Sequence, residues 1–226
     1  MNHELTLKRL GLLALILMLV VSAGAPSRGQ AADTVAAAQL QKLLDGNRRF
    51  VDNHARRPNQ RPNGGTQTPF AAILSCSDAR VPPEIVFDAG VNDLFVVRVA
   101  GNTADDPAAA HPAVTNSVQL QSLAYAVQAL NVKLIVVMGH DQCGAVKGAL
   151  HECGKPAIGP MFQNICPALR GVPGGKLKEA VAANVKSQVD LLKATPPFAD
   201  LVKNNQLRIV GAFNDIDTGR VTVLAP

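Results

Sequence analysis

Apolar positions along the chain follow two different patterns. In residues 36–51 the apolar side chains recur at helical spacing, which predicts an amphipathic helix. Residues 113–130 and 177–193 show the same pattern. Other stretches are continuously apolar over the length of a strand, which predicts four buried β-strands. These strands lie at 70–74, 94–99, 134–138 and 207–211.

The order of these elements indicates the fold class. Buried strands that alternate with amphipathic helices are typical of an α/β fold, in which helices flank both faces of a mostly parallel β-sheet. The helix at 36–51 precedes the first strand and forms an N-terminal helical arm. Residues 154–175 are rich in Pro and Gly, so we expect a surface loop there rather than a domain boundary. With no internal repeat, the sequence predicts a single domain at 32–226.

The first 31 residues resemble an export signal rather than part of the fold. Lys8 and Arg9 precede an apolar run at 10–21, which is too short to cross a bilayer core of about 30 Å comfortably. We therefore expect a signal peptide at 1–31 with cleavage near Ala31, an uncleaved membrane anchor being the alternative. The mature chain would be exported, periplasmic or secreted, with no stable membrane insertion after signal cleavage.

Composition excludes some classes of protein. Apolar residues make up 47% of the chain and charged residues 17%, which fits a globular core and argues against a disordered or coiled-coil chain. The net charge is +5, and it falls to +3 without residues 1–31, which hold three basic residues and one acidic one. Positive charges are scattered, and with no Trp and one Tyr the chain lacks a platform for stacking nucleic-acid bases. We expect no nucleic-acid partner.

Residues of metal-binding types follow two of the predicted strands. Cys76 comes just after the strand at 70–74, and His140 and Cys143 come just after the strand at 134–138. Because the carboxyl ends of parallel strands meet at one edge of a sheet, these three side chains can converge. Two thiolates and one imidazole suit Zn²⁺, and three protein ligands with an open fourth position are typical of a catalytic site. The remaining candidates, which we expect at the surface, are His54, His111 and His151.

The residues after Cys76 suggest a mechanism. Zn²⁺ lowers the pKa of bound water from 15.7 to about 7 and so provides a hydroxide nucleophile for a linear, apolar electrophile. Asp78 is placed to accept a hydrogen bond from that water. Arg80 can hold the Asp78 carboxylate in a bidentate pair. The alternative is an ordinary turn in which Asp78 and Arg80 pair without a catalytic role.

These segments resemble the signatures of the β-class carbonic anhydrases. Residues 76–80, Cys-Ser-Asp-Ala-Arg, are similar to the family's Cys-x-Asp-x-Arg motif, and residues 139–144, Gly-His-Asp-Gln-Cys-Gly, to its Gly-His-x-x-Cys-Gly motif. The resemblance covers nearly all of 32–226. It implies a zinc enzyme that interconverts CO₂ and bicarbonate, a homodimer or larger homo-oligomer, and active sites near the subunit interface. By similarity to plant-type members, it also implies substrate-binding roles for Gln67, Phe95 and Tyr125.

The chain departs from the usual family pattern at Asp141, Ala145 and Asn214. In one bacterial subgroup, a non-catalytic bicarbonate site of Trp, Arg and Tyr favours a closed state in which the carboxylate that matches Asp78 binds zinc. Here Ile73 and Asn214 stand in place of the two aromatic residues, and Arg98 alone has a match. The resemblance therefore implies an open site, with Asp78 paired to Arg80 and no sigmoidal inhibition by bicarbonate.

Two other functions are alternatives to this one, and two cysteines lie outside the predicted metal site. A hydrolase of carbonyl sulfide or carbon disulfide would use the same hydroxide, and a secreted zinc-holding protein would close its site with a fourth ligand. Retention of Asp78 and Arg80 favours catalysis. Cys153 and Cys166 are not needed for the metal, and in an exported protein we expect them to form a disulfide, two free thiols being the alternative.

Overall fold

The computed structural model describes residues 28–58, 60–61, 64–104, 117–155, 159–173 and 175–225. Most of the predicted signal peptide, His111 and the first residues of the helix predicted at 113–130 lie outside these ranges. Within them, no helix is both long enough and apolar enough to cross a membrane.

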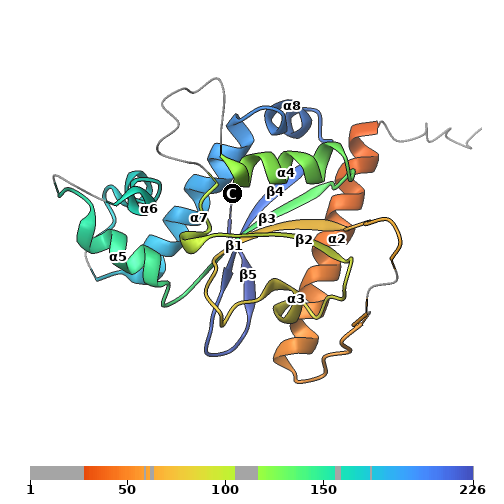
Figure 1. The fold of residues 1–226 in the computed structure, drawn as a ribbon, viewed down its shortest axis with the longest axis horizontal. Helices are drawn as coiled ribbons and strands as arrows, with labels where there is room; N and C mark the ends of the chain where they lie inside the picture. The colour runs from red at the N-terminus through yellow and green to blue at the C-terminus, as the bar shows by residue number, and fades with distance from the viewer. Residues whose placement is uncertain are drawn as a thin grey trace, which may run out of the picture.

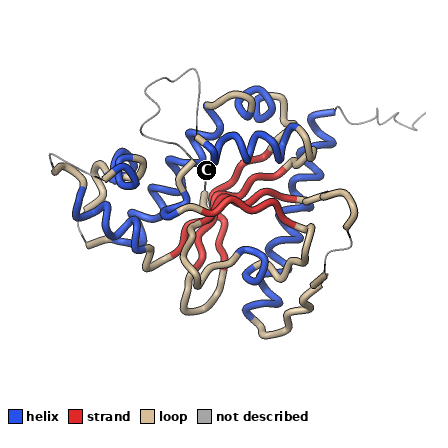
Figure 2. The backbone as a smooth tube through the Cα atoms, viewed as in Figure 1, coloured by secondary structure: helices blue, strands red, loops and turns tan. Residues whose placement is uncertain are grey.

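A twisted β-sheet forms the centre of the part of the chain that the structure describes (Figures 1 and 2). Its five strands run in the order β2-β1-β3-β4-β5. The first four strands are parallel, and β5 is antiparallel to β4. Their bounds are β1 (Ala71–Ser75), β2 (Leu94–Arg98), β3 (Leu134–His140), β4 (Arg208–Asn214) and β5 (Val221–Val223). The mostly parallel α/β fold is confirmed. The sequence pattern missed β5, because three residues are too few to show a period.

Helices cover both faces of the sheet. On one face lie α4 (Val118–Gln128), α7 (Leu177–Ala194) and α8 (Phe198–Lys203), and on the other lie α2 (Arg28–Val51) and α3 (Pro83–Val86). Alternate residues of β1 separate the two cores: Ala72 and Leu74 pack toward α4 and α7, whereas Ala71 and Ile73 pack toward α2 and α3. This arrangement leaves the ends of the strands free to carry chemistry.

Two regions differ from the predicted elements. The N-terminal helix begins at Arg28 rather than at residue 36, so it passes through the predicted cleavage position. The described part of 154–175 is not a plain loop, because it contains α6 (Pro160–Gln163) and the 3₁₀ helix η3 (Cys166–Leu169). Both have a proline in the first turn, where its missing N–H is not needed. A high proline content was therefore a misleading sign of a loop.

The register of the central strands brings the two predicted motifs together. Ser75 at the end of β1 is level with Met138 of β3, so Cys76 and His140 leave the sheet at the same edge. After β3 the chain enters α5 (Gly144–Glu152), and after β2 it enters the 3₁₀ helix η2 (Ala100–Asn102). Both short helices contact each other beside this edge.

Candidate metal centre

Three buried side chains converge at the carboxyl edge of the sheet. The sulfur atoms of Cys76 and Cys143 and a ring nitrogen of His140 all lie within 4.8 Å of one another, and the two sulfur atoms are 4.0 Å apart. The three residues are at most 5% exposed. This is the convergence predicted from the sequence. Within the described ranges, no fourth His, Cys, Asp or Glu joins the group.

The backbone around His140 and Cys143 sets this geometry. His140 is the last residue of β3, and Gln142 adopts a left-handed conformation with φ of 53° that turns the chain back. Cys143 is then the N-cap of α5, at the positive end of the helix dipole, where a thiolate is stabilised. A sharp turn followed by a helix thus presents both donors on one side.

The imidazole is oriented for a cation. Nδ1 of His140 lies 2.7 Å from the carbonyl oxygen of Asp141, which fixes Nδ1 as the protonated nitrogen. Nε2 is buried and has no hydrogen-bond partner among the described residues. A buried acceptor that has no hydrogen-bond partner and lies beside two sulfur atoms is suited to bind a metal ion.

The two thiols affect each other's ionisation in opposite directions. Their hydrogen bond lowers the pKa of Cys76 to about 4, whereas the contact with Cys76 raises the pKa of Cys143. One thiolate therefore opposes the formation of the second, and a cation is needed to hold both in the ionised state. For His140, burial would lower the pKa, but the contacts with Cys76, the Asp141 carbonyl and the Asp78 carboxylate together outweigh burial and raise it. The donor set fits Zn²⁺, which binds thiolates and imidazole in a tetrahedral arrangement.

A carboxylate held by an arginine borders this centre. Arg80 donates from Nε to Asp78 Oδ1 at 3.0 Å and from Nη2 to Asp78 Oδ2 at 2.8 Å. This hydrogen bonding holds the pKa of Asp78 well below its usual range. Asp78 Oδ2 also lies 3.9 Å from His140 Nε2, so the carboxylate faces the three ligands. Asp78 is therefore an ionised acceptor at the open side of the centre.

Comparison with known proteins identifies the family of this chain. The sequence model of the family described as "Carbonic anhydrase" matches residues 71–221, which include the whole centre. The chain belongs to the carbonic anhydrase family. A carbonic anhydrase of Mycolicibacterium smegmatis is 46% identical over 199 residues, covering 81% of this chain and 91% of that protein. Carbonic anhydrase 2 of Mycobacterium tuberculosis is 34% identical over 200 residues, covering 82% and 91%.

Solved structures place this carbonic anhydrase in the β-class. A β-carbonic anhydrase of Coccomyxa in complex with acetazolamide is 26% identical with a TM-score of 0.62, covering 82% of this chain and 86% of that chain. A second likeness, 23% identical with a TM-score of 0.60 and covering 84% and 98%, comes from a study of two tetrameric β-carbonic anhydrases from Sordaria macrospora and shows the shared fold.

One supporting residue of this carbonic anhydrase had no such role in the sequence analysis. Arg98, the last residue of β2, donates from Nε to the carbonyl of Cys76 at 3.0 Å and from Nη2 to the carbonyl of Asp78 at 2.6 Å. It thereby fixes the backbone between the first ligand and the carboxylate. The available signal was a charged residue that ends an otherwise apolar strand. Ile73 and Asn214, the two other positions compared with the bicarbonate site, are both buried in the sheet.

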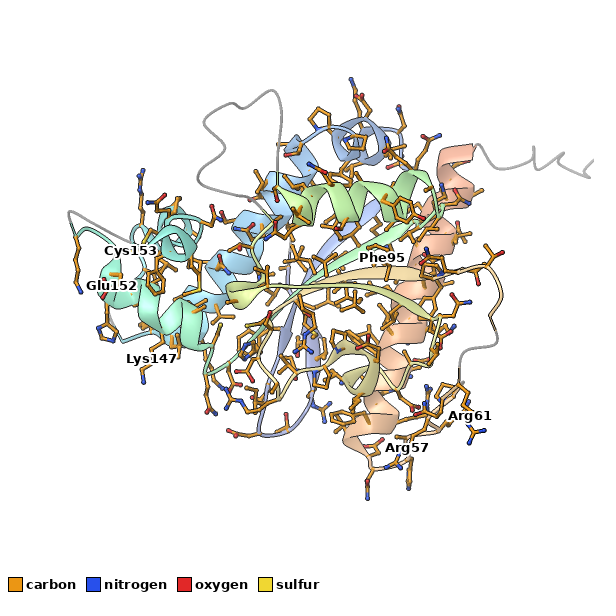
Figure 3. All side chains as sticks on the ribbon, in the orientation of Figure 1. Arg57, Arg61, Phe95, Lys147, Glu152 and Cys153 are labelled. Atoms are coloured by element: carbon orange, nitrogen blue, oxygen red, sulfur yellow. A yellow bond between two sulfur atoms is a disulfide. The ribbon has the colours of Figure 1, made fainter. Side chains whose placement is uncertain are left out.

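The residues expected to bind substrate lie together, but away from the metal ligands of the same chain. Gln67 Nε2 is 3.5 Å from the hydroxyl of Tyr125, and the rings of Phe95 and Tyr125 are 6.2 Å apart. Phe95 is level with Ala72, four residues before Cys76 and thus about 13 Å away along the strand. Figure 3 shows Phe95 toward the opposite end of the sheet from Lys147 and Cys153 of the α5 region. Within one chain, these side chains do not border the metal centre.

The other two cysteines are paired. Cys153 and Cys166 form a disulfide with their Cα atoms 5.5 Å apart, as expected from the sequence. Cys153 is the C-cap of α5 and Cys166 begins η3, so the bond joins two short helices beside the metal centre.

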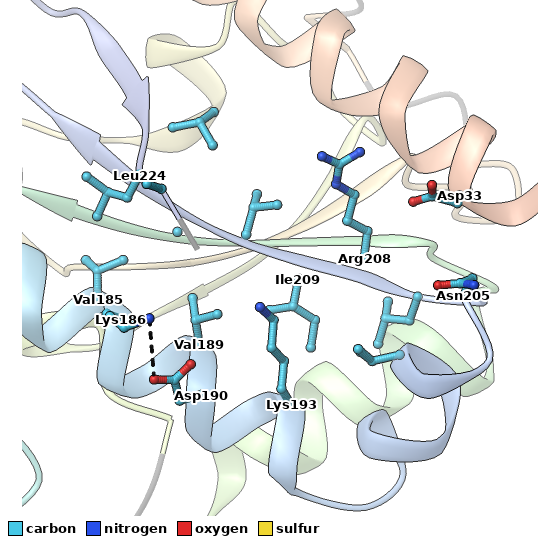
Figure 4. A pocket seen from close by; sticks show the side chains of 16 residues that line it. Asp33, Val185, Lys186, Val189, Asp190, Lys193, Asn205, Arg208, Ile209 and Leu224 are labelled. Atoms are coloured by element: carbon cyan, nitrogen blue, oxygen red, sulfur yellow. Dashed lines mark ion pairs between the residues drawn. The ribbon is translucent and has the colours of Figure 1, made fainter.

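One apolar groove of the described residues is separate from this chemistry. It has a volume of about 310 Å³ and lies between α7 and β4 (Figure 4). Val185, Val189 and Ile209 line it, with the ion pair of Lys186 and Asp190 at 3.9 Å. No residue of the metal centre contributes to its wall. We therefore rest the function on the buried ligands and not on this groove.

Proposed function

We propose that this chain catalyses the reversible hydration of CO₂ to bicarbonate and a proton at a zinc ion held by Cys76, His140 and Cys143. One observation carries the proposal: three buried soft donors meet at the edge of the sheet, directly beside an ionised carboxylate. Bound zinc would supply the Lewis acidity that makes water nucleophilic near neutral pH.

Asp78 and Arg80 would orient the nucleophile. Because its pKa is held low, Asp78 stays ionised at neutral pH and can only accept hydrogen bonds. Asp78 would therefore favour a water-derived nucleophile that still has a proton to donate. Its carboxylate would accept that proton in a hydrogen bond, so that the lone pair of the nucleophile points away from Asp78. Arg80 keeps the carboxylate in place through two side-chain hydrogen bonds and one from its backbone N–H at 2.9 Å. This arrangement supports the open form of the site.

A direct experiment combines metal analysis with a stopped-flow assay of CO₂ hydration on the purified protein. We expect about one zinc per chain and a rate that rises with pH as the nucleophile ionises. Zinc with hydrolysis of carbonyl sulfide or carbon disulfide, but without CO₂ hydration, would favour the alternative hydrolase. Zinc without either activity would favour a zinc-holding protein. A chain without metal would contradict all three.

We further propose a homo-oligomer in which a second copy contributes Gln67, Phe95 and Tyr125 to each active site. Tyr125 is 49% exposed, and among the described strands β2, which carries Phe95, lies at the edge of the sheet. An edge strand beside an exposed aromatic residue is a suitable surface for a second copy. The tetrameric state of the Sordaria macrospora relatives supports an assembly of this kind.

We also propose that the enzyme is exported and cleaved near Ala31. The Cys153–Cys166 disulfide supports an oxidising compartment. Cleavage there would shorten α2 by its first four residues and leave the buried contacts of Ala36 and Leu43 in place. N-terminal sequencing of the protein from its native cell should give Ala32 in a periplasmic or secreted fraction. A full-length chain in the cytosol would contradict this.

A further inference from the structure

The disulfide lies one residue away from a contact that leads to the metal centre. Ile165, the residue before Cys166, is fully buried. It packs so closely on Gly101 that a Cβ atom added to this glycine would lie 2.7 Å from Ile165 Cδ1. Gly101 in turn directs its backbone N–H to Cys76 Sγ at 3.4 Å. A continuous line of contacts therefore connects the disulfide to a metal ligand.

Gly101 can occupy this position only because it is glycine. Its φ is 75°, a left-handed conformation that L side chains rarely adopt, and the space beside its Cα is filled by Ile165 and Ala145. Its carbonyl accepts a hydrogen bond from the buried Asn184 at 2.8 Å. Gly101 is thus held from α7 through its carbonyl and packed against Ile165, the residue before η3, and these contacts keep its N–H on the sulfur.

The disulfide connects α5, which follows Cys143, to the segment that carries Ile165. Cys153 is the C-cap of α5, the helix that begins after the proposed ligand Cys143, and Cys166 begins η3, which follows Ile165. Figure 3 shows Cys153 at the end of α5, close to α6. Without the covalent bond, the segment that carries Ile165 would be held by noncovalent contacts with α5, α6 and α7.

We propose that the Cys153–Cys166 disulfide and Ile165 are positioning elements of the metal centre, which keep the Gly101 N–H on Cys76 Sγ and so slow the release of the metal. This inference rests on the proposed metal-binding function. A hydrogen bond to a thiolate stabilises its negative charge and restrains its orientation, so its loss should weaken the ligand geometry.

The test measures the release of Zn²⁺ from the loaded protein to an excess of a chelating dye. The double variant Cys153→Ser/Cys166→Ser and the single variant Ile165→Ala should both release zinc about tenfold faster, the scale of one hydrogen bond to a charged group. Ile165→Val should restore most of the slow release. Met161→Ala is the matched control, because Met161 lies in the same segment but is 41% exposed, and it should release zinc at the wild-type rate.

Absorption of the Co²⁺-loaded protein gives a second readout. A thiolate that loses a hydrogen bond is a stronger donor, so the sulfur-to-cobalt charge-transfer band should move to longer wavelength in Ile165→Ala and in the double variant. Treatment with a phosphine reductant should reproduce the fast release in the wild type and leave the double variant unchanged. Unchanged release and spectra in both variants, even with a lower melting temperature, would overturn this inference alone. A wild type that binds neither metal would overturn the proposed function as well.

Discussion

The metal centre and the cluster of Gln67, Phe95 and Tyr125 differ in how the chain builds them. The metal ligands follow two neighbouring strands, so the register of β1 and β3 brings them together inside one chain. The second cluster also forms within one chain. Its aromatic residues lie near the amino end of β2 and near the end of α4, away from the carboxyl edge of the sheet that carries the metal centre. Strand pairing alone therefore accounts for the convergence of the three proposed metal ligands. The proposed contact of the second cluster with a metal centre would need another copy of the chain.

Loss of a metal ligand should have the largest effect. Cys143→Ser replaces a thiolate by a poor zinc ligand, so we expect zinc content near zero and a CO₂ hydration rate lower by on the order of a thousandfold or more. Metal analysis and stopped-flow kinetics measure both. His151→Ala, at an exposed position on the same helix α5, should leave both unchanged. Full zinc and full rate in Cys143→Ser would show that the ligand assignment is wrong.

Disruption of the second cluster should separate metal binding from activity. Tyr125→Glu places a charge on the exposed face of α4, so we expect smaller oligomers by sedimentation velocity and a hydration rate lower by about a hundredfold. Zinc content should stay near one per chain. Met161→Glu is the control for an added charge at another exposed apolar position. If Tyr125→Glu lost its zinc, the two regions would not be independent.

Removal of Arg80 should release the Asp78 carboxylate, which borders the metal centre. Arg80→Ala takes away the side-chain hydrogen bonds that hold Asp78 near the metal ligands. We expect Asp78 to bind the metal in place of substrate, with zinc retained and activity reduced by about a hundredfold. A crystal structure of the zinc-loaded variant would show the carboxylate position. Asp78 bound to zinc in the wild type near neutral pH would contradict the open form.

The sequence predicted the parts of the molecule that depend on local pattern. The four parallel strands, the N-terminal helix and α7 have clear periodicity, and Cys76, His140 and Cys143 follow strands whose carboxyl ends must meet. The role of Arg98 could not be predicted, because its partners are the backbone carbonyl oxygens of Cys76 and Asp78. Every residue has such a carbonyl, so the sequence does not mark which ones an arginine will bind. The contact of Ile165 with Gly101 depends on the packing of η3, which the proline content of 154–175 concealed.

The smallest effect on activity should come from Asp88, a buried carboxylate beyond the carboxyl end of α3. It accepts hydrogen bonds from Arg49 Nε at 2.7 Å and from the backbone N–H groups of Arg56 and Arg57 at 3.0 and 2.9 Å. Burial alone would raise the pKa of Asp88, but these hydrogen bonds outweigh burial and lower it. Because its pKa is lower in the folded than in the unfolded chain, its stabilising contribution is present above the ordinary value of about 3.9 and is lost as the pH falls through the lowered pKa.

Asp88→Asn should therefore lower the free energy of unfolding at pH 7 by about 1–3 kcal/mol, since a neutral amide accepts these bonds less strongly and buries an N–H₂ group among donors. Below about pH 4 the difference between variant and wild type should shrink, because the wild-type carboxylate becomes protonated as well. Urea unfolding at both pH values measures this difference. Zinc content and hydration rate of the folded variant should match the wild type, because Asp88 contacts neither the metal ligands nor the cluster around Tyr125. A variant with normal stability and lost zinc would show that the segment at 54–57 supports the metal centre and would remove the separation between the two regions.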